Sequence, residues 1–93
     1  MNNLTLVDLF LNEYWIEKGL SENTVQSYRL DLTALCDWLD KQNLSLETLA
    51  PLDLQQFLGS RLEQGYKATS TARMLSAMRK LFQYLYREKY RTD

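Results

Sequence analysis

The sequence predicts an all-α domain made of four helices. Apolar side chains recur every three or four residues along most of the chain, which is the period of an amphipathic helix. No stretch alternates polar and apolar residues as a half-buried strand does, and the 93 residues include only three Gly and one Pro. A chain of this length has room for one core, so we expect a single domain spanning residues 1–93.

The first helix is expected to begin after Thr5, whose hydroxyl can cap it while Asp8 completes a capping-box-like pattern. Gly19 is a suitable left-handed residue to end it. Leu11 and Trp15 lie to one side of its expected apolar face. That face comprises Leu6, Leu9, Phe10, Tyr14 and Ile16.

The second helix is expected to run from an N-cap at Ser21 to about Asn43. Cys36 lies on its apolar side, where a lone thiol serves as a small buried hydrophobe rather than in redox chemistry. Trp38 lies opposite that side, and we expect it to cover a neighbouring helix rather than to contact a partner. The apolar side comprises Val25, Tyr28, Leu32, Leu35, Cys36 and Leu39.

Residues 44–50 form a short connection whose leucines should close one end of the core. Pro51 suits the first turn of a third helix that continues to Gly65, with Leu54, Phe57, Leu58 and Leu62 on its buried face. The fourth helix should begin around Thr69, where three consecutive hydroxyl residues can cap it, and end near Glu88. Its apolar stripe comprises Met74, Leu75, Met78, Leu81, Phe82 and Leu85.

The side chains needed for catalysis are largely missing. The sequence contains no His, its one Cys is expected to be buried, and no Gly-rich phosphate-binding loop is present. Its acidic residues are spaced as on solvated helix faces rather than as a paired-carboxylate site. We therefore expect no catalytic residue, no metal site and no cofactor in this chain.

Charge is divided unevenly along the chain. Residues 1–65 carry four Lys or Arg against ten Asp or Glu, a net charge of −6, whereas residues 66–93 carry seven against two, a net charge of +5. Such an asymmetry indicates an anionic partner. No apolar run approaches the length of a membrane span, and the first residues lack the basic character of a leader, so a cytoplasmic location is expected.

The positive charge falls on one stripe of the fourth helix, opposite its apolar stripe. The stripe contains no acid and comprises Thr69, Arg73, Ser76, Lys80, Gln83 and Arg87. One interpretation is an ordinary solvated basic face. The other is an interface for nucleic acid, in which Arg73 and Lys80 meet phosphates or base edges, Thr69 and Ser70 donate from the helix start, and Lys67 adds positive potential.

The beginning of the second helix has a related polarity at Thr24, Ser27 and Arg29, which fits either DNA contact or plain helix-start chemistry. Four tyrosines near the basic stripe could stack on bases, but packing at the border of the core is the favoured interpretation. They are Tyr66, Tyr84, Tyr86 and Tyr90.

The strings GLSENTVQSYRLDLTALCDWL (19–39) and GYKATSTARMLSAMRKLFQYLYREKY (65–90) resemble the N-terminal core-binding domain of tyrosine recombinases, the phage-integrase-like family, and in particular its Xer branch. The resemblance covers almost the whole chain. It implies a SAM-like bundle of four helices in two crossed hairpins, which forms half of a clamp around duplex DNA. The second and fourth helices would face the major groove. The implied contacts are Thr24, Ser27, Arg29, Thr69, Ser70 and Arg73, with Lys67 and Lys80 nearby.

In that family the catalytic residues, including the Tyr nucleophile, belong to a C-terminal domain that this sequence does not contain. The resemblance therefore implies that no Tyr here is a nucleophile and that the chain holds DNA for strand exchange in chromosome dimer resolution or DNA integration. The implied partners are a duplex recombination site and other recombinase subunits, XerC-like, in a tetrameric synapse, with no membrane and no small-molecule substrate. The alternative is a helical protein-interaction module whose basic face binds an acidic partner.

Overall fold

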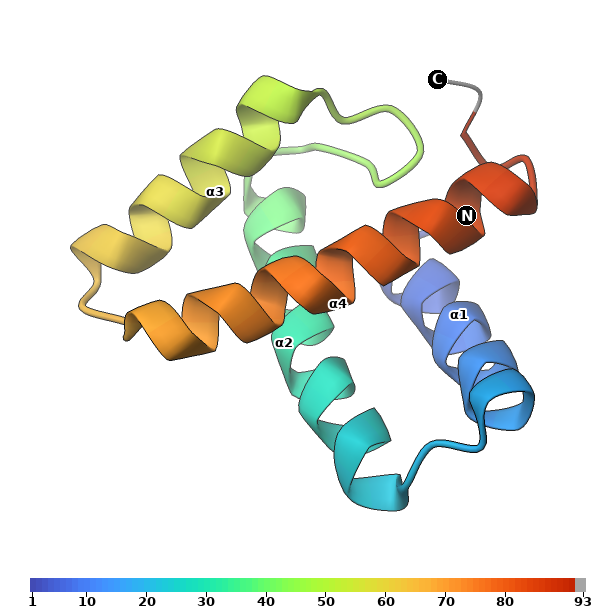
Figure 1. Ribbon diagram of the computed structural model, residues 1–93. Coiled ribbons are helices and arrows are strands. Elements are labelled where there is room, and N and C mark those ends of the chain that lie inside the picture. Colours follow the sequence, from blue (N-terminus) through green and yellow to red (C-terminus); the bar gives the residue numbers. More distant parts are fainter. Residues whose placement is uncertain (92–93) are drawn as a thin grey trace.

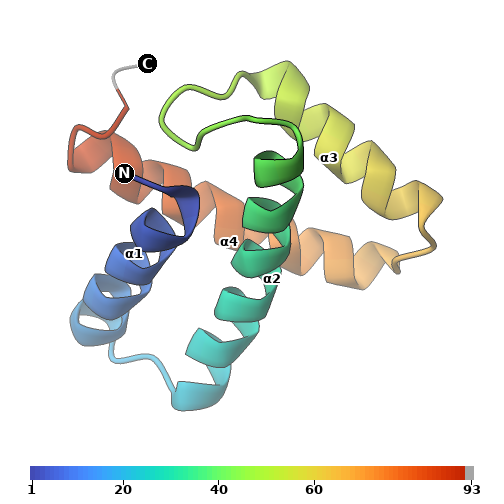
Figure 2. The same ribbon diagram turned by 180° about the vertical axis from the view of Figure 1, so that it is seen from behind.

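The computed structural model describes residues 1–91, and within them every regular element is a helix (Figure 1). The helices are α1 (Asn3–Lys18), α2 (Glu22–Lys41), α3 (Pro51–Glu63) and α4 (Ala68–Arg87). α1 and α2 form one hairpin, α3 and α4 form a second, and α4 runs across both α2 and α1 (Figures 1 and 2). The predicted all-α bundle of two crossed hairpins is confirmed.

The core lies where α4 crosses the first hairpin. It includes Leu46 and Leu49 from the 42–50 connection, which confirms that this connection closes one end of the core. Cys36 is buried, and burial raises the pKa of its thiol to about 12, so the expected packing role is also confirmed. The largest fully buried side chains are Phe10, Leu6, Leu11, Leu32, Leu35, Leu39, Leu46, Met74, Leu81 and Leu85.

One predicted helix start and one predicted cap are wrong: α1 begins earlier than expected, and α4 begins within one residue of Thr69 as expected but without a hydroxyl cap. The cap of α1 is Asn2, whose side-chain oxygen accepts a hydrogen bond from the Thr5 N–H at 2.8 Å, so the helix begins before Thr5. α4 begins at Ala68 with Lys67 as its N-cap, and the hydroxyls that follow do not cap it. The left-handed end of α1 at Gly19, with φ of 59°, and the N-cap at Ser21 are confirmed.

Four leucine or isoleucine side chains predicted to be core residues are exposed instead. They are Leu9, Ile16, Leu62 and Leu75, with exposed fractions from 37% for Leu9 to 81% for Ile16. Leu11, predicted to lie at one side, is buried. α1 is apolar over most of its circumference, so periodicity alone could not choose the side on which α2 and α4 pack. On α3, Arg61 rather than Leu62 lies against the body of the domain.

Trp38 packs against Phe57 of α3, with ring centroids 5.5 Å apart, which confirms that it covers a neighbouring helix. No helix within residues 1–91 is both long and apolar enough to cross a membrane.

Candidate nucleic-acid interface

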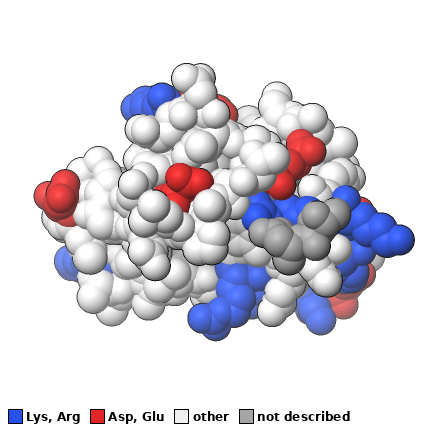
Figure 3. Space-filling model, turned by 90° about the horizontal axis from the view of Figure 1, so that it is seen from above, with Lys and Arg blue, Asp and Glu red and all other residues white. Residues whose placement is uncertain are grey.

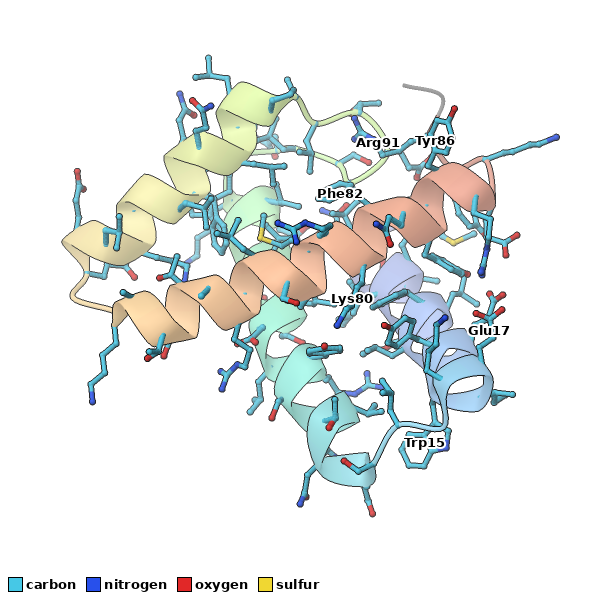
Figure 4. All side chains as sticks on the ribbon, viewed as in Figure 1. Trp15, Glu17, Lys80, Phe82, Tyr86 and Arg91 are labelled. Carbon is cyan, nitrogen blue, oxygen red and sulfur yellow. The ribbon has the colours of Figure 1, made fainter. Side chains whose placement is uncertain are left out.

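The crossing of α4 over α2 joins the predicted basic stripe to the predicted polar start of α2. Arg73 and Lys80, almost two turns apart on α4, both contact residues of α2. Figure 4 shows Lys80 beneath α4, pointing into the angle between α2 and α1. The fold therefore brings together residues of α2 and α4 that are 42 and 52 positions apart in the sequence.

Arg73 is held by an acid that lies below the surface. Its Nε and Nη2 donate to the two carboxylate oxygens of Asp31 at 2.8 and 3.0 Å, and Asp31 is only 5% exposed. The Asp31 hydrogen bond and charge raise the pKa of Arg73. The guanidinium side chain itself is half exposed, and its Nη1 makes no hydrogen bond within residues 1–91. Arg73 can thus offer donors outward from a fixed orientation.

Lys80 is held by aromatic side chains. Its Nζ donates to the Tyr28 hydroxyl at 2.7 Å and lies 5.1 Å from the Tyr28 ring centroid and 6.0 Å from that of Tyr14. The hydrogen bond to Tyr28 raises the pKa of Lys80. Lys80 also borders a pocket of about 230 Å³ that Phe10 and Tyr84 help to line. Its charge is therefore retained and oriented, with no carboxylate bound to it among the described residues.

Arg87, the last residue of the basic stripe, is balanced by acids. It contacts Glu13 at 2.6 Å, Glu17 at 3.3 Å and Glu88 at 3.3 Å. Glu13 and Glu17 belong to α1. The stripe that lacks acids in the sequence thus acquires them from neighbouring helices, and α4 carries fewer uncompensated charges than the linear pattern indicated.

The N-terminus of α4 is open to an anion. Its first turn contains no acidic residue, and no side chain within residues 1–91 caps it. Thr69 is exposed, Ser70 is partly exposed, and Lys67 is exposed at the N-cap position. The unpaired backbone N–H groups and the positive end of the helix dipole both favour a phosphate there.

On α2, the three predicted contact residues do not share one side. Thr24 and Ser27 lie within about 100° of Tyr28 around the helix, on the flank that includes Asp31. Thr24 also hydrogen-bonds to Ser21 as part of the N-cap. Arg29 points toward α1, where it pairs with Asp8. The surface that contains Arg73 and Lys80 therefore includes Thr24 and Ser27, whereas Arg29 belongs to the opposite flank.

Figure 3 shows the molecule from above the view of Figure 1, where many of the visible Lys and Arg atoms lie at the end at which α4 finishes. No group of three or more potential ligands that could hold a metal ion occurs within the described part of the chain.

Three of the four tyrosines near the basic stripe have packing partners. Tyr84 is buried 5.5 Å from Phe10 and its pKa is raised to about 12, mainly by burial. Tyr90 lies 6.3 Å from Tyr84, and Tyr66 lies under the Arg61 guanidinium. Tyr86 is exposed but borders an apolar pocket beside Phe82 (Figure 4). The interpretation of these tyrosines as packing and border residues is supported for Tyr66, Tyr84 and Tyr90.

Fold and surface together describe an all-α domain with one oriented cationic face. The chain matches the family described as "Phage integrase, N-terminal SAM-like domain" over residues 7–89, and it belongs to that family. The resemblance expected from its two sequence strings is confirmed.

Curated relatives are similar over the whole chain. The chain is 87% identical to tyrosine recombinase XerD of Haemophilus influenzae over 93 residues, covering 100% of this chain and 31% of that protein. It is 73% identical to XerD of Pasteurella multocida over 93 residues, again 100% of this chain and 31% of that protein, and 60% identical to XerD of Yersinia pestis over 88 residues, 95% of this chain and 29% of that protein. The chain thus spans less than a third of the length of these relatives.

Proposed function

We propose that this chain is the DNA-binding domain of a Xer-type site-specific tyrosine recombinase and that it holds a duplex recombination site through α2 and α4. The observation that carries the proposal is the pair of oriented cations, Arg73 and Lys80, at the crossing of these two helices. Both keep their charge and have exposed surface. Their spacing along one helix allows them to meet a polyanion together.

The open N-terminus of α4 supports the same proposal. Thr69, Ser70 and Lys67 would receive one phosphate there, while Thr24 and Ser27 approach the duplex from α2. The distribution of acids also supports it, because Asp37 and Asp40 lie near the far end of α2.

In this proposal strand exchange is carried out by a catalytic domain elsewhere in the parent recombinase, acting in the cytoplasm with further recombinase subunits in a synapse. This chain contributes affinity and position. Half of a clamp has lower affinity than a whole one because it lacks the effective concentration supplied by the second half.

The test is fluorescence anisotropy of a short labelled duplex with the 93-residue chain at low salt. Lys67→Gln and Lys80→Gln are each expected to weaken binding, since each removes a phosphate-facing charge, whereas Asp37→Asn at the acidic end of α2 should change it little. Circular dichroism checks that each variant is folded. Absence of binding by the unmodified chain at low salt would refute the proposal, and equal losses from Lys80→Gln and Asp37→Asn would show that the interface lies elsewhere.

A further inference from the structure

Arg61 of α3 is a buried arginine without an acidic partner. It is 6% exposed, yet it forms no salt bridge and no hydrogen bond within residues 1–91, and its Nε is enclosed without an acceptor. By contrast, the arginines that do form salt bridges, Arg29, Arg73 and Arg87, all have exposed side-chain surface. A buried guanidinium normally has a carboxylate beside it, because an uncompensated buried charge is costly.

Aromatic rings contact this guanidinium by its face, and its Nε is enclosed, so the terminal Nη atoms are the part that a ligand can reach. The Arg61 carbon Cζ lies 4.0 Å from the centroid of the Tyr66 ring and 6.0 Å from that of Phe57. Stacking of this kind favours the cation but uses none of its five N–H donors. The edge of the guanidinium is the part that binds a carboxylate or a phosphate through two parallel hydrogen bonds.

Arg61 lines a pocket of about 210 Å³ between the C-terminal half of α2 and α3, two elements that can be followed in Figure 2. Trp38 and Phe57 form apolar parts of its wall, and Ser60 and Gln64 supply further polar groups. Asp37 also lines the pocket but makes no salt bridge with Arg61. This pocket lies between α2 and α3, whereas the proposed DNA interface lies between α2 and α4.

We propose that this pocket binds the side-chain carboxylate of a partner protein, presented by an aspartate or glutamate with apolar neighbours. Lys41 lines the pocket together with Arg61 and Asp37, so the charged side chains of the lining sum to one positive charge, which one carboxylate matches. A run of DNA phosphates would instead bring several negative charges against Asp37. Leu62, next to Arg61, is 58% exposed and Tyr66 is 48% exposed, which gives the rim the apolar surface that a protein segment covers.

Side-chain NMR of the 93-residue chain tests this site directly, because an enclosed Arg61 Nε–H should give a distinct resonance. The probes are two capped peptides, acetyl-Leu-Asp-Leu-amide and its uncharged counterpart acetyl-Leu-Asn-Leu-amide. The Asp peptide is expected to shift the Arg61 resonance saturably, and the Asn peptide to bind about tenfold more weakly, as expected for loss of a charge-assisted pair. Absence of a saturable shift, or equal shifts with both peptides, would overturn the proposal.

Variants assign the effect to the guanidinium edge. Arg61→Lys keeps the charge but removes the two-pronged donor geometry. The affinity for the Asp peptide, measured from backbone chemical shifts, should therefore fall about tenfold. The matched control Arg79→Lys alters an exposed guanidinium of α4 and should change nothing. If Arg61→Lys unfolds the domain at the temperature of measurement, Tyr66→Leu provides a second variant. It removes the stacking ring and should also weaken binding of the Asp peptide.

The same resonance separates this site from the DNA interface. Addition of a short duplex should leave the Arg61 Nε–H signal in place while it shifts signals from the start of α4. A duplex that shifts the Arg61 signal, when the Asp peptide does not, would show that the pocket serves a phosphate and would overturn the assignment to a protein carboxylate.

Discussion

At the scale of single residues, the Arg73–Asp31 pair governs how α4 presents its charge. Asp31 is buried at the helix crossing and occupies one edge of the guanidinium, so the remaining donors of Arg73 face outward. Of these two residues, only Arg73 was predicted from the sequence to contact DNA. Asp31 looked like one more acid of α2, because the 42-residue separation conceals the contact.

This pair predicts that Arg73→Ala has two effects that can be separated. The substitution leaves the buried Asp31 carboxylate unpaired, so we expect a loss of about 1–3 kcal/mol in the free energy of unfolding together with weaker DNA binding. In the double variant Arg73→Ala/Asp31→Asn, the stability should largely recover while the DNA affinity should not. Urea denaturation and duplex anisotropy measure the two quantities. Recovery of DNA affinity in the double variant would mean that Arg73 acts only through the fold.

Cys36 predicts a loss of stability at alkaline pH. Burial raises the pKa of its thiol from 9.0 to about 12, so the neutral form is retained in the folded state while the unfolded state ionises first. The contribution of the neutral thiol to the free energy of unfolding is fully present below about pH 9 and is lost as pH rises toward 12. The raised pKa of Tyr84 changes the free energy of unfolding in the same direction. Urea denaturation at pH 7 and pH 11 should show a smaller pH dependence for Cys36→Ala. An unchanged dependence would contradict the role assigned to the thiol.

At the scale of helices, predictability followed how clearly each sequence pattern separates apolar from polar sides. α4 has a clean division, and the predicted Met74, Met78, Leu81 and Leu85 are buried. Leu75, at the edge of the stripe, is 40% exposed and Phe82 is partly exposed, whereas the buried Thr71, Ala77 and Tyr84 were not predicted. α1 is apolar nearly all round, and two of the residues assigned to its core side, Leu9 and Ile16, are exposed. An amphipathic pattern predicts which side of a helix faces the core only where a polar side contrasts with the apolar one.

The start of α4 predicts opposite effects on stability and on binding. Thr69→Glu places an acid in a first turn that has none, so the helix dipole should stabilise the domain by about 0.3–1 kcal/mol. The same charge would repel a phosphate at that terminus, and DNA affinity at low salt should fall at least about fivefold. Thermal denaturation and anisotropy measure the two changes.

The control for Thr69→Glu is Gln55→Glu, which makes the same charge change at an exposed position of α3. Its effect on DNA affinity should be small. A comparable loss from both variants would mean that net charge, rather than the terminus of α4, controls binding.

At the scale of the molecule, folding brings the acidic first part of the chain onto the basic last part. Arg73 pairs with Asp31, and Arg87 pairs with Glu13 and Glu17, so ion pairs join residues up to 74 positions apart. The charge asymmetry correctly indicated α4 as the cationic element. It could not show which of its charges are balanced, because that depends on which helices α4 crosses.

The balance of these charges predicts a modest salt dependence for DNA binding. If Lys67, Arg73 and Lys80 are the cations that neutralise phosphates, the slope of log affinity against log salt should be about −2.7, or roughly −0.9 for each phosphate neutralised. Lys67→Gln should reduce the magnitude of the slope by about 0.9. Arg87→Gln should leave it unchanged, because three carboxylates already bind Arg87, whereas Arg73 has one carboxylate partner and its Nη1 makes no hydrogen bond within residues 1–91.

Anisotropy of the same duplex over a salt series measures all three slopes. A slope much steeper than about −2.7 would mean that further cations such as Arg79 reach the backbone. The opposite outcome for Arg87 is a slope that Arg87→Gln reduces as much as Lys67→Gln does. That result would mean that the ion pairs of Arg87 with Glu13 and Glu17 break when DNA binds, so that the whole basic stripe of α4 faces the duplex.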